Sequence, residues 1–321
     1  MKSKFGNFKF QNNKEYLDSF LPKDRIGEIR VGSSLSAPTH APFQILGISE
    51  SVGSQVNNGL PGAENSFHAF IEEFSLTQIH DSFQSTLFSF LGVVTIQNIN
   101  LNFSGETVEE LDEFVFEVLN KTVTKEQIPI VIGGSHNNAL PIMRWVNKNK
   151  SDFAVINIDA HADTRETHVR HSGNSFSFAI NENTLSHYHV LGLHEAYNNA
   201  YIRFYLKENA KFFSYFEDYL FKKRDIHEDI RHISSMIKNI PCGIEIDTDA
   251  IVNFPSSAIS PSGWTLNEMR KILNNLTTSL SKVSYLHISE AAPLNKGERK
   301  MCGKAISYLV RDFIANYKLG N

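Results

Sequence analysis

Short apolar segments recur along the chain, and polar residues follow each of them directly. The segments are about four to eight residues long and rich in β-branched side chains, a pattern typical of buried strands. The predicted strands cover residues 43–48, 92–99, 128–132, 153–158, 189–193, 242–246 and 283–288, with 92–99 expected at an edge of the sheet.

Between these segments the apolar residues recur with the period of a helix. A Thr three residues before a Glu, at Thr107 and again at Thr265, forms a capping box and predicts a helix start. A short helix is expected at residues 15–21, and the last helix should end before Gly320. The clearest apolar stripes are Leu111, Phe114, Val115, Val118 and Leu119, and then Ile306, Leu309, Val310, Phe313, Ile314 and Tyr317.

The alternation of strand and helix predicts an α/β fold. Parallel neighbours need helical crossovers, so the central sheet should be mostly parallel, with helices on both faces in a three-layer α/β/α sandwich. Open sheets of this kind bind ligands beyond the carboxyl ends of their strands, which is where this chain collects its polar residues. No linker or repeat interrupts the pattern. We therefore expect one domain over residues 27–321, with residues 1–26 as an N-terminal extension packed on it.

Composition and charge exclude several classes of protein. The 321 residues have 41% hydrophobic content, a net charge of −4 and a pI near 6.4. Neither sign of charge forms runs, so nucleic acid and anionic membrane are not expected partners. No stretch approaches about 18 apolar residues and the N-terminus lacks the apolar run of a signal peptide, which favours a cytoplasmic location. Cys242 and Cys302 are the only cysteines, so no disulfide framework is expected.

The predicted strand at residues 153–158 runs into Asp159-Ala-His161-Ala-Asp163. Side chains at i, i+2 and i+4 project the same way where a strand ends. Burying two carboxylates and an imidazole without partners would cost several kcal/mol, so a cation is their natural partner. The alternative interpretation is a polar strand end whose acids simply face water.

Two more predicted strands are followed by side chains that can bind a metal. His136 comes after the strand at residues 128–132, and Asp247 and Asp249 come after the strand at residues 242–246. The diglycine Gly133-Gly134 allows a sharp turn that brings His136 close to the sheet edge, although a lone His there is more often a hydrogen-bonded core residue. Four carboxylates and two imidazoles suit two divalent ions about 3.5–4 Å apart, whose bridging water becomes a hydroxide nucleophile near neutral pH. Ligation rich in oxygen favours Mn²⁺ over Mg²⁺, Fe²⁺ or Zn²⁺. The convergent residues are His136, Asp159, His161, Asp163, Asp247 and Asp249.

These motifs resemble the ureohydrolases, the family of arginase, agmatinase and formimidoylglutamase. The family's metal motifs GGxH, DAHxD and DxD stand here at residues 133–136, 159–163 and 247–249, in the family's order, and the likeness extends from about residue 43 to the C-terminus. The resemblance implies an arginase-like fold and a trimer or hexamer. It further implies that His136, Asp159, Asp163 and Asp247 hold one Mn²⁺ and that Asp159, His161, Asp247 and Asp249 hold the other.

Departures from the family pattern favour the formimidoylglutamase branch. Ser135 replaces the Asp that is usual in GGDH, which should change the tuning of the metal site and leave metal binding intact. Phe176 stands where arginases carry a proton-shuttling His, and the formimidoylglutamase motif SGTPF has the same aromatic residue. That branch also carries Asp-x-Arg, matched by Asp163 and Arg165. The loop at residues 57–63 is either a plain surface turn or the border of a pocket, and it lacks the branch's arginines.

The resemblance implies that hydroxide bridging the two metals converts N-formimidoyl-L-glutamate to L-glutamate and formamide. Glu290, in an EAAP segment similar to the family's ExNP, would face the amidinium group; otherwise it is a capped strand end. Asp163 or Asp249 would relay a proton to the leaving amine, with His171 either a substitute shuttle or a plain loop residue. Arg165 would pair with a substrate carboxylate or else form a surface salt bridge. Asn174 and Asn198 are expected to hydrogen-bond the substrate.

Two further functions stay open. A guanidino hydrolase would release urea from arginine, agmatine or a relative; a cationic substrate amine would need extra carboxylates in the pocket, whereas a glutamate substrate would need arginines such as Arg165 and Arg170. A metal-binding relative without turnover would act as a sensor or structural subunit. The complete set of ligands argues against such a silent relative, and the missing shuttle histidine is the one point in its favour.

Overall fold

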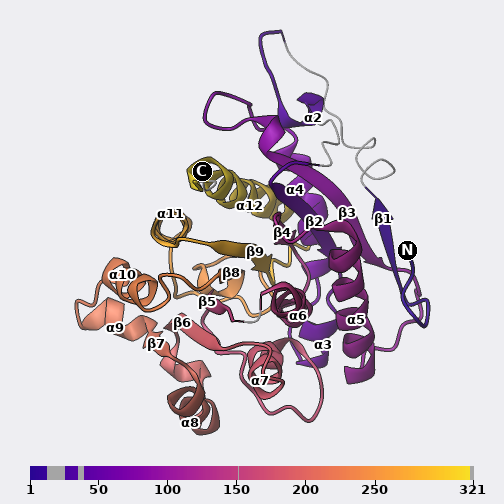
Figure 1. Ribbon diagram of the computed structural model, residues 1–321. Helices are drawn as coiled ribbons and strands as arrows, with labels where there is room; N and C mark the ends of the chain where they lie inside the picture. Colours follow the sequence, from indigo (N-terminus) through magenta and orange to yellow (C-terminus); the bar gives the residue numbers. More distant parts are fainter. Residues whose placement is uncertain (13–25, 35–39, 151, 319–321) are drawn as a thin grey trace.

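A nine-stranded sheet forms the centre of the computed structural model, which describes residues 1–12, 26–34, 40–150 and 152–318 (Figure 1). Across the described residues the strand order is β1-β3-β2-β4-β9-β8-β5-β6-β7. Strand β1 is antiparallel to β3, and the other neighbours are parallel. The strands are β1 (Phe8–Asn12), β2 (Phe43–Ser49), β3 (Phe88–Ile96), β4 (Ile128–Ile132), β5 (Ala154–Ile158), β6 (His187–Leu193), β7 (Phe212–Tyr215), β8 (Cys242–Asp247) and β9 (Val283–Ser289).

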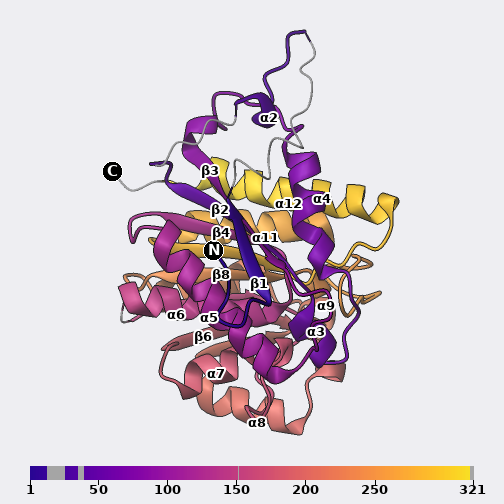
Figure 2. The same cartoon turned by 90° about the vertical axis from the view of Figure 1, so that its right-hand side faces the viewer.

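Helices cover both faces of the sheet, so the predicted three-layer α/β/α architecture is confirmed (Figures 1 and 2). One apolar core joins the sheet to α4 (Ser66–Phe74), α10 (Ile226–Met236), α11 (Leu266–Ser279) and α12 (Lys296–Asn316). The core on the other face joins it to α5 (Gly105–Thr122), α6 (Ala139–Asn149), α7 (Ser175–Asn181) and α8 (Ala200–Asn209). Shorter helices are α2 (Val31–Ser34), α3 (Val52–Val56) and α9 (Phe216–Phe221). None of the helices within the described ranges is long and apolar enough to span a membrane.

Most of the predicted elements are present, and the Thr265 capping box is confirmed at the start of α11. The other predicted box is wrong. Ser104 caps α5 and accepts the backbone N–H of Thr107, which lies inside the helix. The Glu110 carboxylate instead accepts hydrogen bonds from Ser3 and Asn7 in the N-terminal segment of the chain. These long-range partners are invisible in the local pattern.

Strand β3 also differs from the strand predicted at residues 92–99. It begins four residues earlier, at Phe88, and Gly92 lies inside it at a bulge, with a φ of +142° that a side chain would not tolerate. It is not an edge strand, because β1 pairs along its outer side. Strands β1 and β7 were not predicted. Residues 15–21 and Gly320 lie outside the described residues.

The sheet order decides where the functional groups meet. Strands β4, β9, β8 and β5 are neighbours in space although β8 and β9 come last in the sequence. The chain builds β4 and β5, continues outward through β6 and β7, and then returns to fill the gap between β4 and β5. The carboxyl ends of these four parallel strands therefore share one edge, at a change of winding direction where open sheets bind ligands.

Candidate metal centre

Three carboxylates converge on the imidazole of His136. Its Nδ1 atom lies 3.3 Å from Asp159 Oδ2, 2.9 Å from Asp163 Oδ2 and 3.1 Å from Asp247 Oδ2. One ligand atom from each of the four residues falls within 4.8 Å of all the others. Apart from the edge of Asp163, these side chains are withdrawn from solvent.

Sharp backbone turns bring these groups together. Gly133 and Gly134 follow β4 with φ of +88° and +72°, and a Cβ on Gly133 would lie 2.2 Å from a neighbouring hydroxyl. The chain can therefore bend back against the sheet edge only with glycine at this point. At the ends of β5 and β8, Asp159 and Asp247 each accept the backbone N–H two residues ahead through one oxygen. The other oxygen of each is left facing His136.

The donor set fits a divalent cation. Nδ1 of His136 makes no hydrogen bond within the described structure, although three carboxylate oxygens surround it. Burial and the neighbouring Asp159 raise the pKa of Asp163, and burial with Asp249 and Asp159 raises that of Asp247 well above its usual range. Crowded acids around an unbonded imidazole nitrogen are what a hard to borderline cation stabilises, and thiolate is absent from the set.

His161 and Asp249 extend the cluster toward solvent. His161 Nδ1 lies 3.7 Å from Asp159 Oδ1 and 3.6 Å from Asp249 Oδ2. Burial alone would lower the pKa of His161, but Asp159 and Asp249 raise it to about 10. The six predicted ligands therefore do gather at one place, as a tight group of four around His136 with a looser pair beside it.

Glu290 closes the cluster from the end of β9. Its Oε1 accepts the backbone N–H of His136 at 2.5 Å, while its buried Oε2 has no hydrogen-bond partner among the described residues. Burial and the nearby Asp249 raise the pKa of Glu290 to about 8. Glu290 and Asp163 both adopt left-handed backbone conformations, with φ of 64° and 47°. Such strain is costly for residues other than glycine and concentrates at functional sites.

A polar cavity of about 200 Å³ opens over these residues. The loop carrying Asn57, Asn58 and Gly59 borders it, which decides between the two interpretations of that loop in favour of a pocket border. Tyr197, which the sequence did not single out, lies beside the His161 ring at 5.7 Å between centroids. The other lining residues are Ser54, His161, Ala162, Asp163, Arg165, Ser172, Asn198, Ile202, Asp247, Asp249, Ser257, Ala258 and Glu290.

The residues expected to bind substrate differ in how they are placed. Arg165 lines the cavity with an exposed side chain and pairs with no carboxylate in the described part of the chain. Asn198 also lines it, but its amide already bonds the backbone of Ala160, Ala162 and His194. The Asn198 side chain thus braces the loop that follows β5.

His171, Asn174 and Arg170 do not line this cavity. His171 accepts the N–H of Gly173 and faces a second hollow, and burial with the charges of Arg170 and Arg165 lowers its pKa to about 4. Both protons and the oxygen of the Asn174 amide are engaged within its own loop. Arg170 is buried and pairs with Asp112, so it cannot receive a substrate carboxylate.

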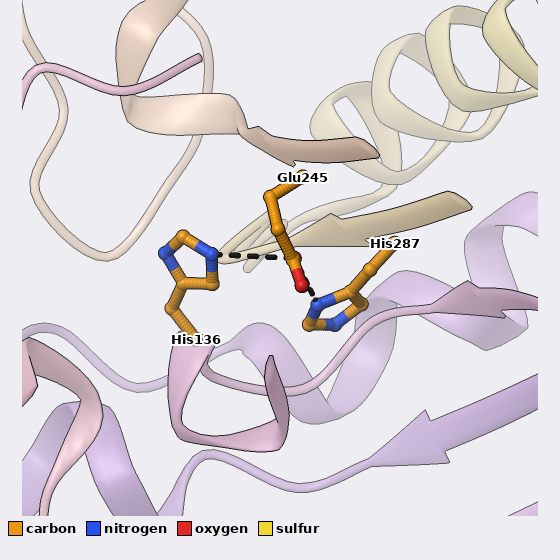
Figure 3. A group of neighbouring side chains, drawn as sticks. All are labelled: His136, Glu245 and His287. Carbon is orange, nitrogen blue, oxygen red and sulfur yellow. Dashed lines mark hydrogen bonds and ion pairs between the residues drawn. The ribbon is translucent and has the colours of Figure 1, made fainter. Parts of the chain in front are cut away.

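A layer of buried polar groups beneath the cluster was missed from the sequence. Glu245 lies between the rings of His136 and His287 (Figure 3). Tyr285 donates its hydroxyl to the same carboxylate at 2.7 Å. One signal was available: Glu245 is the acid in an otherwise apolar strand segment and, two residues before Asp247, shares its face of the sheet.

Comparison with known proteins gives consistent results. The sequence model of the arginase family matches residues 42–315. Formimidoylglutamase of Streptococcus pyogenes serotype M12 is 23% identical over 87% of both chains. That of Macrococcus caseolyticus is 28% identical, and the match spans about half of each protein, 49% of this chain and 48% of the relative.

Solved structures resemble this one along nearly the whole chain. Formimidoylglutamase from Bacillus subtilis has a TM-score of 0.78 at 16% identity and covers 95% of this chain and 99% of its own. Formiminoglutamase from Trypanosoma cruzi, solved with Mn²⁺, has a TM-score of 0.72 at 20% identity and covers 91% and 100%. At sequence identities this low, the structural likeness shows that the fold is shared and nothing more.

Proposed function

This chain belongs to the arginase family, and on that premise we propose that it is a hydrolase of linear amidines that acts on N-formimidoyl-L-glutamate. The observation that carries the proposal is the joint placement of a divalent-cation donor set, an unpaired Glu290 oxygen and Arg165 around one cavity. The products would be L-glutamate and formamide. The relatives named above bear the same activity in their names.

Two Mn²⁺ ions are the proposed cofactor. His136, Asp159, Asp163 and Asp247 would hold one ion, and Asp159, His161, Asp247 and Asp249 would hold the other, so that Asp159 and Asp247 are shared. When bound, two such ions supply an activated water near neutral pH and stabilise negative charge on the reacting carbon's substituents. The arrangement around His136 Nδ1 and the absence of thiolate from the set support this assignment.

Glu290 is placed to orient the amidinium group. Its Oε1 is fixed by the N–H of His136, which leaves Oε2 free to accept a proton-bearing nitrogen from a ligand in the cavity. A charge-assisted hydrogen bond of this kind contributes about 1.5–3 kcal/mol. A cationic amidine would also offset the acids that raise the pKa of Glu290.

Arg165 supplies the complementary charge at the mouth of the cavity. Among the described residues it is the only Lys or Arg that lines the cavity, and its guanidinium has no acidic partner. A planar guanidinium binds a carboxylate through two parallel hydrogen bonds. The pocket thus suits a substrate that is cationic at the reacting end and anionic at the far end, as N-formimidoyl-L-glutamate is.

The leaving amine needs a proton, and Asp163 or Asp249 would relay it. Both carboxylates line the cavity in which the substrate would lie, which supports either as the proton relay. Phe176 is buried and packs edge-on to the His136 ring, 5.4 Å between centroids. The buried ring of Phe176 therefore takes the position of the proton-shuttling histidine of arginases, and His171 does not line the cavity.

The guanidino hydrolase alternative finds less support. A substrate with a free cationic amine would need a carboxylate away from the ligand set. Among the described residues, Glu290 is the only acid that lines the cavity beyond the proposed ligands. Glu290 is already assigned to the reacting end. A silent relative would have no need for strained Asp163 and Glu290 backbones.

Product analysis on the Mn²⁺-loaded protein tests the proposal. N-formimidoyl-L-glutamate, L-arginine and agmatine are offered in parallel, and formamide, glutamate and urea are quantified. We expect formamide and glutamate from the first compound and no urea from the others. Urea as the main product would overturn the choice of branch, and no turnover with two ions bound would favour the silent relative.

A further inference from the structure

A row of polar side chains crosses the sheet directly beneath the proposed metal site. Asn157 on β5, Glu245 on β8 and His287 on β9 are register partners in three neighbouring parallel strands. Residues in register point to the same face of a sheet, so these side chains lie side by side within the apolar core. All three have no solvent exposure. Nothing in the proposed hydrolysis uses them.

Glu245 is the centre of this row. Its Oε2 lies 2.6 Å from Nδ1 of His287 and 3.4 Å from Nε2 of His136 (Figure 3). Its Oε1 accepts the hydroxyl of Tyr285 at 2.7 Å. A buried carboxylate is stable only when its oxygens are bonded. Here Tyr285 and His287 already hold both oxygens, and the carboxylate stays directed at the His136 ring.

The two nitrogens of His136 therefore face different environments. Nδ1 faces the carboxylates of Asp159, Asp163 and Asp247, whereas Nε2 lies 3.4 Å from Glu245 Oε2. Neither nitrogen makes a hydrogen bond within the described residues, and Glu245 is the carboxylate on the Nε2 side of the ring. An imidazole that binds a metal through one nitrogen carries its proton on the other, and a carboxylate behind that proton fixes both the tautomer and the ring orientation.

We propose that Glu245 is a positioning residue that accepts the Nε2 proton of His136 and so presents Nδ1 to the metal ion. His287 and Tyr285 hold Glu245 in place from the neighbouring strand. This inference rests on the metal site of the proposed function. It adds to that site a role for Glu245, a residue inside strand β8. It concerns only the ion bound by His136, because the ion pairs of His161 in the described structure are with Asp159 and Asp249 and not with Glu245.

The same three groups could instead form an inner cation site. Ligand atoms of His136, Glu245 and His287 also fall within 4.8 Å of one another. The 2.6 Å separation between His287 Nδ1 and Glu245 Oε2 is that of a direct charge-assisted hydrogen bond, which favours a positioning network. The number of ions bound per chain distinguishes the two arrangements.

Manganese titration of the metal-free full-length protein provides the test. Binding is followed by calorimetry and by electron paramagnetic resonance, which separates free, isolated and spin-coupled Mn²⁺. For wild type we expect two coupled ions per chain. For Glu245→Gln we expect one ion to bind about 10–100-fold more weakly while the other keeps its affinity, so that isolated Mn²⁺ appears at limiting metal. Tyr285→Phe removes one of the two hydrogen bonds that hold Glu245 and should weaken the same ion, by less than Glu245→Gln does. Glu117→Gln, at an exposed carboxylate that pairs with Lys121 on α5, is the control and should leave both affinities unchanged.

A second measurement does not depend on any variant folding. In Zn²⁺-loaded wild type labelled with ¹⁵N-histidine, the Nε2 proton of His136 should be present, hydrogen-bonded and slow to exchange. An unprotonated Nε2 would overturn the proposal, as would wild-type affinities in Glu245→Gln, equal weakening of both ions, or a third ion lost on His287 substitution. If wild type binds two coupled ions without hydrolysing N-formimidoyl-L-glutamate, the proposed function fails and the role of Glu245 stands.

Discussion

Two clusters of charged side chains lie buried in this molecule, and they are built in opposite ways. Around Arg170 the charges are balanced. Its Nε lies 2.8 Å from Asp112 Oδ2, and the guanidinium also donates to the carbonyl oxygens of His171 and Asn137 and to the side chains of Asn174 and Ser175. Around His136 and His161 the acids outnumber the imidazoles, and Nδ1 of His136 and Oε2 of Glu290 make no hydrogen bond within the described structure.

The difference separates what holds the site from what performs its chemistry. Arg170 ties α5 to the turn that carries His136 and to the loop between Asp163 and Asn174, so a satisfied ion pair secures the support. The acid-rich cluster gains its cohesion only from the cation it is proposed to bind. Destabilised, strained groups at a functional site are the usual cost of activity.

Breaking the balanced cluster should have the largest effect. Asp112→Ala leaves the Arg170 guanidinium buried without its counter-charge, which costs about 3–5 kcal/mol. Urea unfolding monitored by circular dichroism measures the loss. The paired replacement Asp112→Leu with Arg170→Met removes both charges and should recover much of the stability. A single variant as stable as wild type would contradict the proposed support.

Removing one acid from the unbalanced cluster should act in the opposite direction. We expect Asp163→Asn to raise the unfolding temperature of the metal-free protein, because burial and Asp159 disfavour the charged form of this residue. The same change should lower turnover in the presence of Mn²⁺ by about 10²–10³-fold, the loss typical of a group that stabilises charge at the reacting centre. Thermal scans in chelator and initial-rate assays read the two effects. If Asp163→Asn melted at a lower temperature than wild type in chelator, the acid-rich cluster would not be destabilising, and the contrast with the Arg170 cluster would be wrong.

Arg165 differs from both clusters because its charge is exposed and has no acidic partner in the described part of the chain. Arg165→Ala should raise KM for N-formimidoyl-L-glutamate by about 10–100-fold, equivalent to a lost charge-assisted hydrogen bond, with little change in kcat. Arg165→Lys keeps the charge and should restore part of the affinity. Unchanged KM in the Ala variant would return Arg165 to a surface role. Stability should not change measurably in either variant.

The smallest expected effect is a pH dependence of the metal-free protein. Folded-state pKa values near 8 for Glu290 and near 10 for His161 mean that the native state holds protons which the unfolded chain releases at lower pH. Each of these two groups alone should therefore lower the stability by about 1.5 kcal/mol between pH 6.5 and 8. His171 and His189, whose pKa values burial lowers to about 4, act in the opposite sense only below about pH 6.5.

Saturating Mn²⁺ displaces these protons and should abolish or reverse the slope. Melting temperatures at matched ionic strength, with chelator and with Mn²⁺, measure the two slopes. Stability of the metal-free protein that rises over this pH range would contradict the charge balance described for the cluster.

The predictions from sequence succeeded where the signal was local and chemical. Buried strands were recognisable from their apolar content, and the presence of His and Asp side chains behind three of them together indicated a metal site. Failures came where the partner is distant in the chain. Glu110 pairs with the N-terminal segment and leaves Ser104 to cap α5, so the capping box expected at Thr107 is absent. The substrate contacts expected of Asn174 and Asn198 stay predictions, and the amides of both residues already hydrogen-bond backbone atoms.

The amino-acid sequence by itself determined the α/β class, most strands and the six candidate metal ligands, because strand periodicity and ligand chemistry are properties of short segments. Only the tertiary structure decided that β8 and β9 fill the gap between β4 and β5. That order brings four strand ends to one edge, sets Glu245 in register with His287, and separates Arg170 from the cavity that Arg165 lines. Strand order and register depend on packing over the whole sheet, which no local segment encodes.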